Sequence, residues 1–283
     1  METMNLKIIL ILLLGVLCLN ETTWSHDAAS HGIHFKHSVP TEKKPWTEYK
    51  KIFVKESRIA AGAKFFSENT NLINRVSKKY GVDPFIIVTI AGVESNYGVH
   101  HSQFSVFNAL YSQIHEIPRR TKWATRELAE FIKYCYKDKL DPQEIGGSYA
   151  GAFGYGQFIP SSFTRYSVDF NENGVREPYS WPDVLGSIAN YLRMNGYKKN
   201  SNDYNKGGDI YKSVYAYNHA DNYVMAVLEL TERIRERCTG SRKYYPSTIT
   251  NFDRKRVKMY KSKGWAPDKT INMEAWVEFS KES

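Results

Sequence analysis

The sequence predicts a mainly α fold, and three observations support this prediction. In several stretches between residues 46 and 239, apolar residues recur with the 3.6-residue spacing of a helix. Proline, aspartate and glycine stand where such helices would begin and end. Stretches with the two-residue alternation of a strand are few and short. We therefore expect a helical core whose connecting loops are rich in glycine and aromatic residues.

The N-terminal segment predicts an exported protein, in the periplasm or secreted. Residues 1–25 carry a lysine followed by an uninterrupted apolar run, residues 8–19, which is typical of a signal peptide and too short for a membrane span. Cys18 raises the alternative of a lipid anchor, but Leu17 stands where a small residue is expected, so lipid anchoring is not favoured. Residues 26–45 are polar and aperiodic, as in a flexible leader. No later segment is apolar enough to span a bilayer.

The first well-marked helix is expected after Asp83, which can cap a helix that begins at Pro84 and is closed by Gly98. Glu94 follows two isoleucines at spacings of four and eight residues, which places it on the apolar stripe of this helix. A carboxylic acid in apolar surroundings holds its proton more tightly, so a buried glutamate suits the general acid that protonates a sugar oxygen. The alternative is that Glu94 caps the helix or pairs with a basic residue.

Three further helices are expected at residues 122–139, 182–196 and 222–237. Cys135 and Cys238 fall in the first and the last of them. Export permits a disulfide between the two, but both positions suit buried thiols, and we favour free cysteines.

Two loop segments resemble a ligand-binding surface. "GSYAGAFGYGQFIPSSFTRY", residues 147–166, and "YAYNHADNY", residues 215–223, mix glycine with tyrosine, phenylalanine and amide side chains. Glycine lets a backbone approach a ligand closely, while aromatic faces and amides suit sugar rings. A tight loop between helices with aromatic residues in the core is the alternative.

Composition is that of a soluble globular protein, with 42% hydrophobic and 24% charged residues. A formal charge of +9 favours an anionic partner, such as a cell-wall polymer, a lipid surface or nucleic acid. Nucleic acid is the least favoured of these, because the chain has no Lys/Arg-rich helix with base-reading residues. We expect a monomer that does not bind nucleic acid.

In order, the segments "GVESNYG", "IPRR", "GSYAGAFGYGQFIPSS", "DFNENG", "SIANYL" and "YNHADNY" resemble the lytic murein transglycosylase B family, over roughly Tyr80 to Ile234. This resemblance implies a lysozyme-like helical core with a peptidoglycan-binding groove. It also implies that Glu94 is the single catalytic acid/base and needs no cofactor. Glu94 would act on the bond between N-acetylmuramic acid and N-acetylglucosamine, and the muramoyl 6-hydroxyl would attack to leave a 1,6-anhydromuramoyl end.

Further positions match the family's groove, and the glycan strands of peptidoglycan are the implied partner. The substrate-binding residues predicted from this match are Arg119, Arg120, Ser148, Gln157, Phe158, Tyr191, Tyr217, Asn218 and Tyr223. Their hydroxyl and amide groups could bind the acid or an N-acetyl group, and their rings could pack on sugars. The two guanidinium groups suit the carboxylates of stem peptides, although a solvated charge pair is an equal alternative for at least one of them.

The segment "DFNENGVREPYSWPD", residues 169–183, begins like an EF-hand calcium loop, but Ser180 stands at the twelfth position, where a glutamate is standard. The family's longer loop implies a later ligand. The predicted calcium ligands are Asp169, Asn171, Asn173, the Val175 carbonyl and Asp183. Because only two of them are carboxylates, we expect weak affinity for a structural Ca²⁺, with a cation-free or sodium-bound turn as alternatives.

The resemblance predicts a lysozyme-like transglycosylase domain at residues 46–239 and leaves 240–283 as a basic appendage of unknown role. Residues 193–216 are too few for the small β domain that family members often insert there, which would open one side of the groove. Two other functions stay open. A hydrolytic muramidase would need a second carboxylate, for which Asp169 and Asp183 are candidates, and a non-catalytic protein would only bind peptidoglycan.

Overall fold

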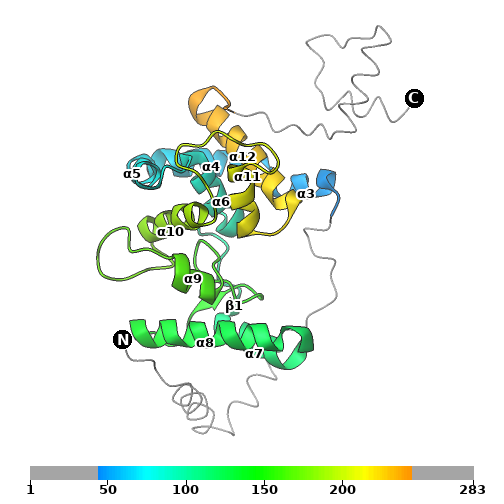
Figure 1. Ribbon diagram of the computed structural model, residues 1–283, viewed down its shortest axis with the longest axis vertical. Helices are drawn as coiled ribbons and strands as arrows, with labels where there is room; N and C mark the ends of the chain where they lie inside the picture. Colours follow the sequence, from blue (N-terminus) through cyan, green and yellow to red (C-terminus); the bar gives the residue numbers. More distant parts are fainter. Residues whose placement is uncertain (1–43, 244–283) are drawn as a thin grey trace, which may run out of the picture. The chain divides into compact units, whose positions relative to one another are not determined.

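Helices make up most of the computed structural model, which describes residues 44–243 (Figure 1). They are α3 (Trp46–Phe53), α4 (Glu56–Glu68), α5 (Thr70–Tyr80), α6 (Pro84–Ser95), α7 (Val106–Glu116), α8 (Thr121–Asp138), α9 (Pro160–Tyr166), α10 (Trp181–Met194), α11 (Asp209–Tyr217) and α12 (Asp221–Thr239). Within the described residues, one antiparallel sheet pairs β1 (Phe104–Ser105) with β2 (Gly146–Gly147). The prediction of a mainly α fold is confirmed. The predicted signal peptide, almost all of the leader and most of the appendage lie outside the described residues.

Helix α6 forms the centre of the core. The Asp83 carboxylate accepts the N–H of Phe85 at 2.9 Å, and Pro84 is the first helical residue, as the sequence predicts. Residues 86–91 are all 0% exposed, because α4, α5, α10 and α12 pack around this helix. The helix is therefore enclosed on every face and has no single apolar stripe.

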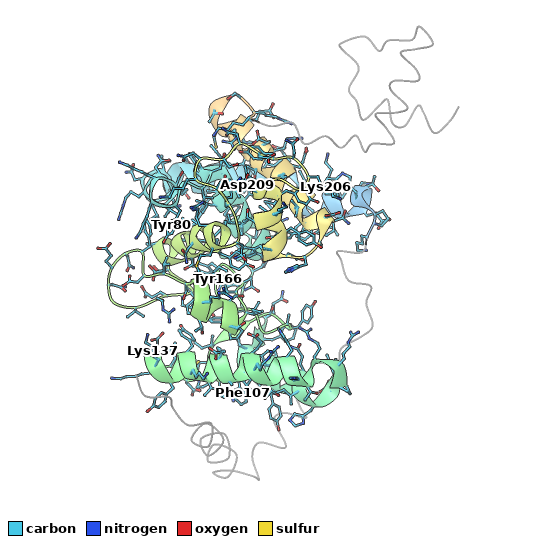
Figure 2. The ribbon with its side chains drawn as sticks, in the orientation of Figure 1. Tyr80, Phe107, Lys137, Tyr166, Lys206 and Asp209 are labelled. Carbon is cyan, nitrogen blue, oxygen red and sulfur yellow. The ribbon has the colours of Figure 1, made fainter. Side chains whose placement is uncertain are left out.

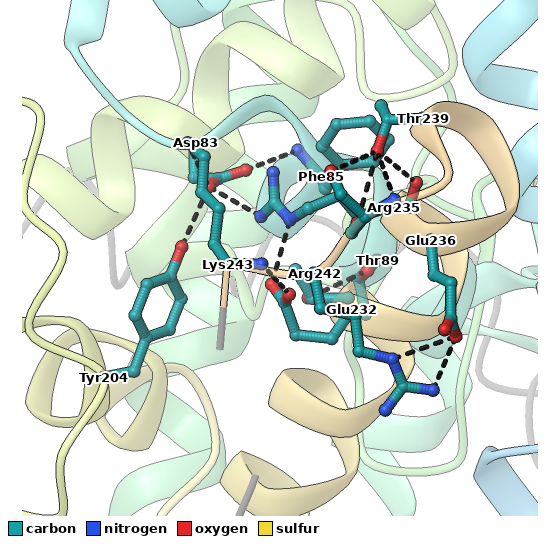
Figure 3. Close-up of polar contacts among 12 residues, drawn as sticks. Asp83, Phe85, Thr89, Tyr204, Glu232, Arg235, Glu236, Thr239, Arg242 and Lys243 are labelled. Atoms are coloured by element: carbon teal, nitrogen blue, oxygen red, sulfur yellow. Dashed lines mark hydrogen bonds and ion pairs between the residues drawn. The ribbon is translucent and has the colours of Figure 1, made fainter. Parts of the chain in front are cut away.

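A network of buried charges fixes the start of α6 to the last helix (Figure 3). Asp83 accepts hydrogen bonds from the Arg235 guanidinium at 2.7 Å and from the Tyr204 hydroxyl at 2.9 Å. Arg235 also pairs with Glu232 at 3.0 Å, and Glu232 accepts the backbone N–H of Lys243 at 2.7 Å. Each of these two buried carboxylates accepts several hydrogen bonds, one of them from the oppositely charged Arg235, so its negative charge is balanced. The network therefore fixes the start of α6 against α12.

Helices α7 and α8 lie on one side of the molecule, with α9 and β1 between them and the α4–α6–α12 group (Figure 1). Glu127 of α8 is 4% exposed, and its two oxygens accept the N–H and the hydroxyl of Ser161 at 2.9 Å. This carboxylate satisfies the free N–H of the first turn of α9. It therefore fixes the helix that follows the glycine-rich loop.

The loop between α10 and α11 folds back on itself. Asp209, labelled in Figure 2, begins α11, and its carboxylate accepts the N–H of Lys198 at 2.9 Å and the hydroxyl of Ser201 at 2.8 Å. Tyr197 and Tyr204 of the same loop are buried, and both hydroxyls contact Asp83. Tyr197 and Tyr204 thus make this loop part of the core.

Comparison with the sequence shows which helix ends were predictable. The predicted helices 122–139, 182–196 and 222–237 are α8, α10 and α12, with ends that differ by no more than two residues. The prediction that Gly98 closes α6 is wrong. The helix ends at Ser95, and Asn96 caps it in the left-handed conformation with φ 49°.

Both cysteines of the described region are free. Cys135 is buried in α8, as expected, but Cys238 is exposed in the last turn of α12, so the prediction of two buried thiols holds for only one of them. Between residues 44 and 243, no helix combines the length and apolar character that crossing a membrane requires.

Candidate active site

The candidate site is built around a contact between two helices that are distant in sequence. Glu94 lies in the last turn of α6, and Tyr223 lies in the first turn of α12, 129 residues later. The Tyr223 hydroxyl donates to Glu94 Oε1 at 2.6 Å. The position of Glu94 on the apolar stripe predicts a buried side chain, but the side chain is half-buried. The reason is that Glu94 lies near the end of α6, beyond the fully enclosed residues.

Three predicted groove residues form one aromatic cluster beside this contact. Tyr217, the last residue of α11, lies 5.5 Å from Phe158 and 4.8 Å from Tyr191 between ring centroids. Its hydroxyl donates to the Gly156 carbonyl at 2.6 Å, and the Tyr191 hydroxyl donates to the Ala216 carbonyl at 2.6 Å. The cluster therefore joins the glycine-rich loop to α10 and α11.

Electrostatics support the grouping of these phenols with Glu94. Burial raises the pKa of both Tyr217 and Tyr223 well above the usual value, and the negative charge of Glu94 raises the pKa of each further. Burial also raises the pKa of Tyr191 to about 12. All three hydroxyls therefore remain protonated at neutral pH and act as hydrogen-bond donors.

The polar side chains of the glycine-rich loop help to shape the loop itself. Gln157 has φ 48°, and its amide donates to the carbonyls of Gly154 at 2.9 Å and His101 at 3.4 Å. The Ser148 hydroxyl accepts the N–H of Ala152 at 3.2 Å. At Gly154, with φ 74°, a Cβ atom would lie 2.6 Å from the Pro178 carbonyl oxygen, so only glycine permits this close approach.

The two predicted arginines have different surroundings. Both lie in a 3-10 helix, η2 (Pro118–Arg120), directly before α8. Arg119 is exposed, whereas Arg120 is half-buried, with its guanidinium 4.3 Å from the centre of the Trp123 ring. Burial lowers the pKa of Arg120, and Tyr149 counteracts this effect. Asn218 follows α11, and its carbonyl accepts the N–H of Ala220 at 2.7 Å.

The predicted calcium ligands share one loop between α9 and α10. Asp169 accepts the N–H groups of Asn173 at 3.1 Å and Gly174 at 2.7 Å. Asp183 is 1% exposed and accepts the N–H groups of Phe170 at 2.8 Å and Glu177 at 2.9 Å. The two aspartates therefore hold the two ends of the loop together.

Sequence reasoning missed the carboxylate of Glu177 in this loop. Its Oε2 accepts from the amides of Asn173 at 2.8 Å and Asn171 at 3.5 Å. The ninth position of an EF-hand loop, often a ligand through water, could have signalled it. In the part of the chain that the structure describes, no three or more His, Cys, Asp or Glu side chains gather as a metal cluster. The donors of this loop are oxygens, which fit Ca²⁺ better than a softer metal.

Two known proteins resemble this chain in fold. The lytic transglycosylase SltB1 of Pseudomonas aeruginosa superposes with a TM-score of 0.66 at 27% identity, over 81% of this chain and 93% of that one. The Escherichia coli lytic transglycosylase SLT35, solved in complex with calcium, gives a TM-score of 0.64 at 27% identity, over 68% of this chain and 79% of that one. The predicted lysozyme-like fold of the lytic transglycosylases is confirmed.

Sequence comparison identifies the family. Membrane-bound lytic murein transglycosylase B of Escherichia coli (strain K12) is 36% identical over 154 residues, which are 54% of this chain and 43% of that protein. The match thus spans less than half the length of that relative. The pattern that defines the transglycosylase SLT domain matches residues 20–206, well over half of the chain. The chain therefore belongs to the transglycosylase SLT domain family.

Proposed function

We propose that this protein is a lytic transglycosylase of peptidoglycan. The bond cleaved is the β-1,4 linkage between N-acetylmuramic acid and N-acetylglucosamine, and Glu94 is the general acid and base. The observation that carries the proposal is the 2.6 Å hydrogen bond that positions the Glu94 carboxylate against Tyr223, beside a cluster of aromatic residues suited to sugar rings.

The proposed reaction uses one carboxyl group twice. The protonated Glu94 gives its proton to the oxygen between the sugars as the bond from that oxygen to the muramoyl anomeric carbon breaks. The 6-hydroxyl oxygen of the same muramoyl residue then bonds to that carbon, and its proton passes to Glu94. The product carries a 1,6-anhydro ring, the carboxyl group is regenerated, and no water is consumed.

The geometry of the loop aspartates favours this reaction over hydrolysis. Hydrolysis with inversion would need a second carboxylate to activate water. Asp183 is 1% exposed and is committed to backbone N–H groups at 2.8 Å and 2.9 Å, and Asp169 holds two further N–H groups. Both candidate carboxylates are thus engaged in holding the loop.

Substrate contacts are assigned by chemistry. Tyr217, which is half-buried, is proposed to contact a sugar ring, and the buried Phe158 and Tyr191 are proposed to support it from within the aromatic cluster. The remaining proposed contacts, through hydroxyl, amide or guanidinium groups, are Ser148, Gln157, Asn218, Tyr223, Arg119 and Arg120. The Arg120 guanidinium, oriented over Trp123, suits a carboxylate of a stem peptide.

Calcium and location are the other parts of the proposal. We propose that Asp169, Asn171, Asn173, the Val175 carbonyl and Asp183 hold a structural Ca²⁺, a reading supported by the calcium complex of the similar SLT35. The ion would stiffen the loop that leads into α10. The apolar run near the N-terminus supports export, to the periplasm or the medium.

Mass spectrometry of digested peptidoglycan tests the function. Purified protein and a Glu94→Gln variant are incubated in parallel with isolated sacculi. We expect muropeptides with 1,6-anhydromuramic ends from the wild type and none from the variant. Reducing ends would instead identify a muramidase, and binding without cleavage would identify a protein that only holds glycan.

A further inference from the structure

The turn that follows Glu94 has an uncommon backbone. Asn96 and Tyr97 both have positive φ, 49° and 58°, so two successive non-glycine residues are left-handed. This conformation is tolerated by asparagine and is unusual for a bulky aromatic residue. Strained residues of this kind persist where their surroundings hold them, and they cluster at functional sites.

The ring of Tyr97 is held in a notch between two glycines. A Cβ atom on Gly92 of α6 would lie 2.4 Å from the ring carbon Cζ, and one on Gly62 of α4 would lie 2.4 Å from the hydroxyl oxygen. On another side, the Phe65 ring stacks on Tyr97 with centroids 5.1 Å apart. The ring thus occupies space that exists only because both helices have glycine there.

The Tyr97 hydroxyl does not explain this placement. Within the described residues it is buried and has no hydrogen-bond partner. Burial raises the pKa of this phenol far above the usual value, so the group stays neutral. The packing of the aromatic ring, and not a hydrogen bond of the hydroxyl, therefore accounts for the position of Tyr97.

We propose that Tyr97 is a positioning residue for Glu94, an inference that rests on the proposed function. Its ring, wedged between Gly62 and Gly92, holds the left-handed turn that ends α6. The carboxylate stands three residues before Tyr97, and its contact with Tyr223 is only 2.6 Å long. If the ring is lost, the helix end shifts and the carboxylate leaves this position.

Kinetics on soluble glycan fragments test the proposal, with Tyr97→Leu and Gly92→Ala as the disruptive variants. Tyr97→Leu removes the ring, and Gly92→Ala places a methyl group where the ring lies. We expect kcat to fall about 10- to 100-fold in each, with KM changed less than about twofold, since a displacement of about 1 Å at a reacting group has effects of this size. Tyr97→Phe keeps the ring and should keep the wild-type kcat.

Two controls separate positioning from general stability. Val76→Ala opens a cavity in α5, distant in sequence from the turn, and should lower Tm without lowering kcat at 25 °C. The ¹³C resonance of the Glu94 carboxyl, assigned by its absence in Glu94→Gln, should move in Tyr97→Leu and stay in Tyr97→Phe and Val76→Ala. A wild-type kcat and an unmoved resonance in Tyr97→Leu would overturn the proposal, even if Gly92→Ala fails to fold.

The readouts also distinguish this inference from the proposed function. If the wild type yields no anhydro ends, the function fails, and the Glu94 resonance still decides whether Tyr97 positions the carboxyl group. If anhydro ends form but Tyr97→Leu loses kcat only as Val76→Ala does, positioning fails and the function stands.

Discussion

At the scale of single residues, the arrangement depends on one hydrogen bond. The Tyr223 hydroxyl donates to Glu94. Burial and the nearby Glu94 carboxylate raise the pKa of this phenol well above its usual value, so it stays protonated. The donor is thus available at any pH at which the protein would act. A catalytic carboxyl group gains a fixed orientation from such a partner before substrate arrives.

Tyr223→Phe removes this donor and keeps the ring. A hydrogen bond to a charged group is worth about 1.5–3 kcal/mol, so we expect activity to fall about 10- to 100-fold and Tm to fall by a few degrees. Release of muropeptides is the measurement. Tyr136→Phe is the matched control, since this tyrosine of α8 is 78% exposed and should leave activity unchanged. Equal rates in both variants would contradict a role for the Tyr223 hydroxyl.

The residue scale also shows what the sequence could predict of the site. The motif order identifies Glu94 and Tyr223 by resemblance, but no periodicity relates two residues 129 positions apart. Their contact exists because α6 and α12 pack side by side, which is a tertiary property. Tyr97 was missed for a similar reason, since its role depends on neighbours that only the folded turn supplies, whereas the ninth position of the loop pattern could have indicated Glu177.

At the scale of elements, local signals predicted some helices well and others poorly. Asp83 and Pro84 mark the start of α6, because a cap and a proline act within one turn. The other helices of the described region were not predicted individually; they are α3, α4, α5, α7, α9 and α11. For α9 the stabilising groups come from elsewhere, since the Ser161 N–H is satisfied by Glu127 of α8. Such a helix depends on packing more than on its own sequence.

Asp83→Ala tests the ion network at the start of α6. It removes the cap of Phe85 and one partner of the buried Arg235. We expect unfolding to become easier by about 3–5 kcal/mol, the usual result of breaking a buried pair, and Tm to fall by about 10 °C. In the control, Asp141→Ala removes an exposed carboxylate that accepts one backbone N–H, and should cost about 1 kcal/mol or less. Similar losses of unfolding free energy in the two variants would mean that the ion network contributes little to stability.

Calcium should act on the loop between α9 and α10. If the ion binds only the folded loop, it raises the free energy of unfolding by about 1.4 kcal/mol at a concentration tenfold above Kd. Tm then rises by a few degrees. Differential scanning fluorimetry with millimolar Ca²⁺ and with a chelator measures this shift. Asp169→Asn should reduce the shift, while Glu172→Gln, an exposed carboxylate of the same loop outside the proposed ligand set, should not. An unchanged Tm at millimolar Ca²⁺ would disprove the site.

At the scale of the whole molecule, the helices surround a core rich in tyrosine. Tyrosines that are buried with a raised pKa are Tyr134, Tyr191, Tyr197, Tyr204 and Tyr223. Burial is the largest cause of the raised pKa in each of these tyrosines. Two of these hydroxyls contact Asp83 and one contacts Glu94, so the same group of residues supports the core and the site.

This core predicts a loss of stability at alkaline pH. The unfolded tyrosines lose their protons near pH 10, whereas the folded ones hold theirs, with Tyr191 at a pKa of about 12. Above pH 10 the unfolded state therefore binds fewer protons than the folded state, and the free energy of unfolding falls as pH rises. Each buried tyrosine contributes a loss of about 1.4 kcal/mol per pH unit until its own folded pKa is reached. Below pH 10 this stabilisation is complete.

Tm measured between pH 8 and pH 11.5, together with tyrosinate absorbance at 295 nm, checks this prediction. We expect a nearly constant Tm up to about pH 10, followed by a steep fall that coincides with a late, cooperative rise in absorbance. Tyr136→Phe, which removes an exposed tyrosine, should leave the fall in Tm unchanged. Tyr191→Phe should make the fall shallower, because one buried group no longer titrates in the unfolded state. A Tm that stays constant above pH 10 while the absorbance of all the tyrosines develops without unfolding would show that the buried phenols reach solvent in the folded protein.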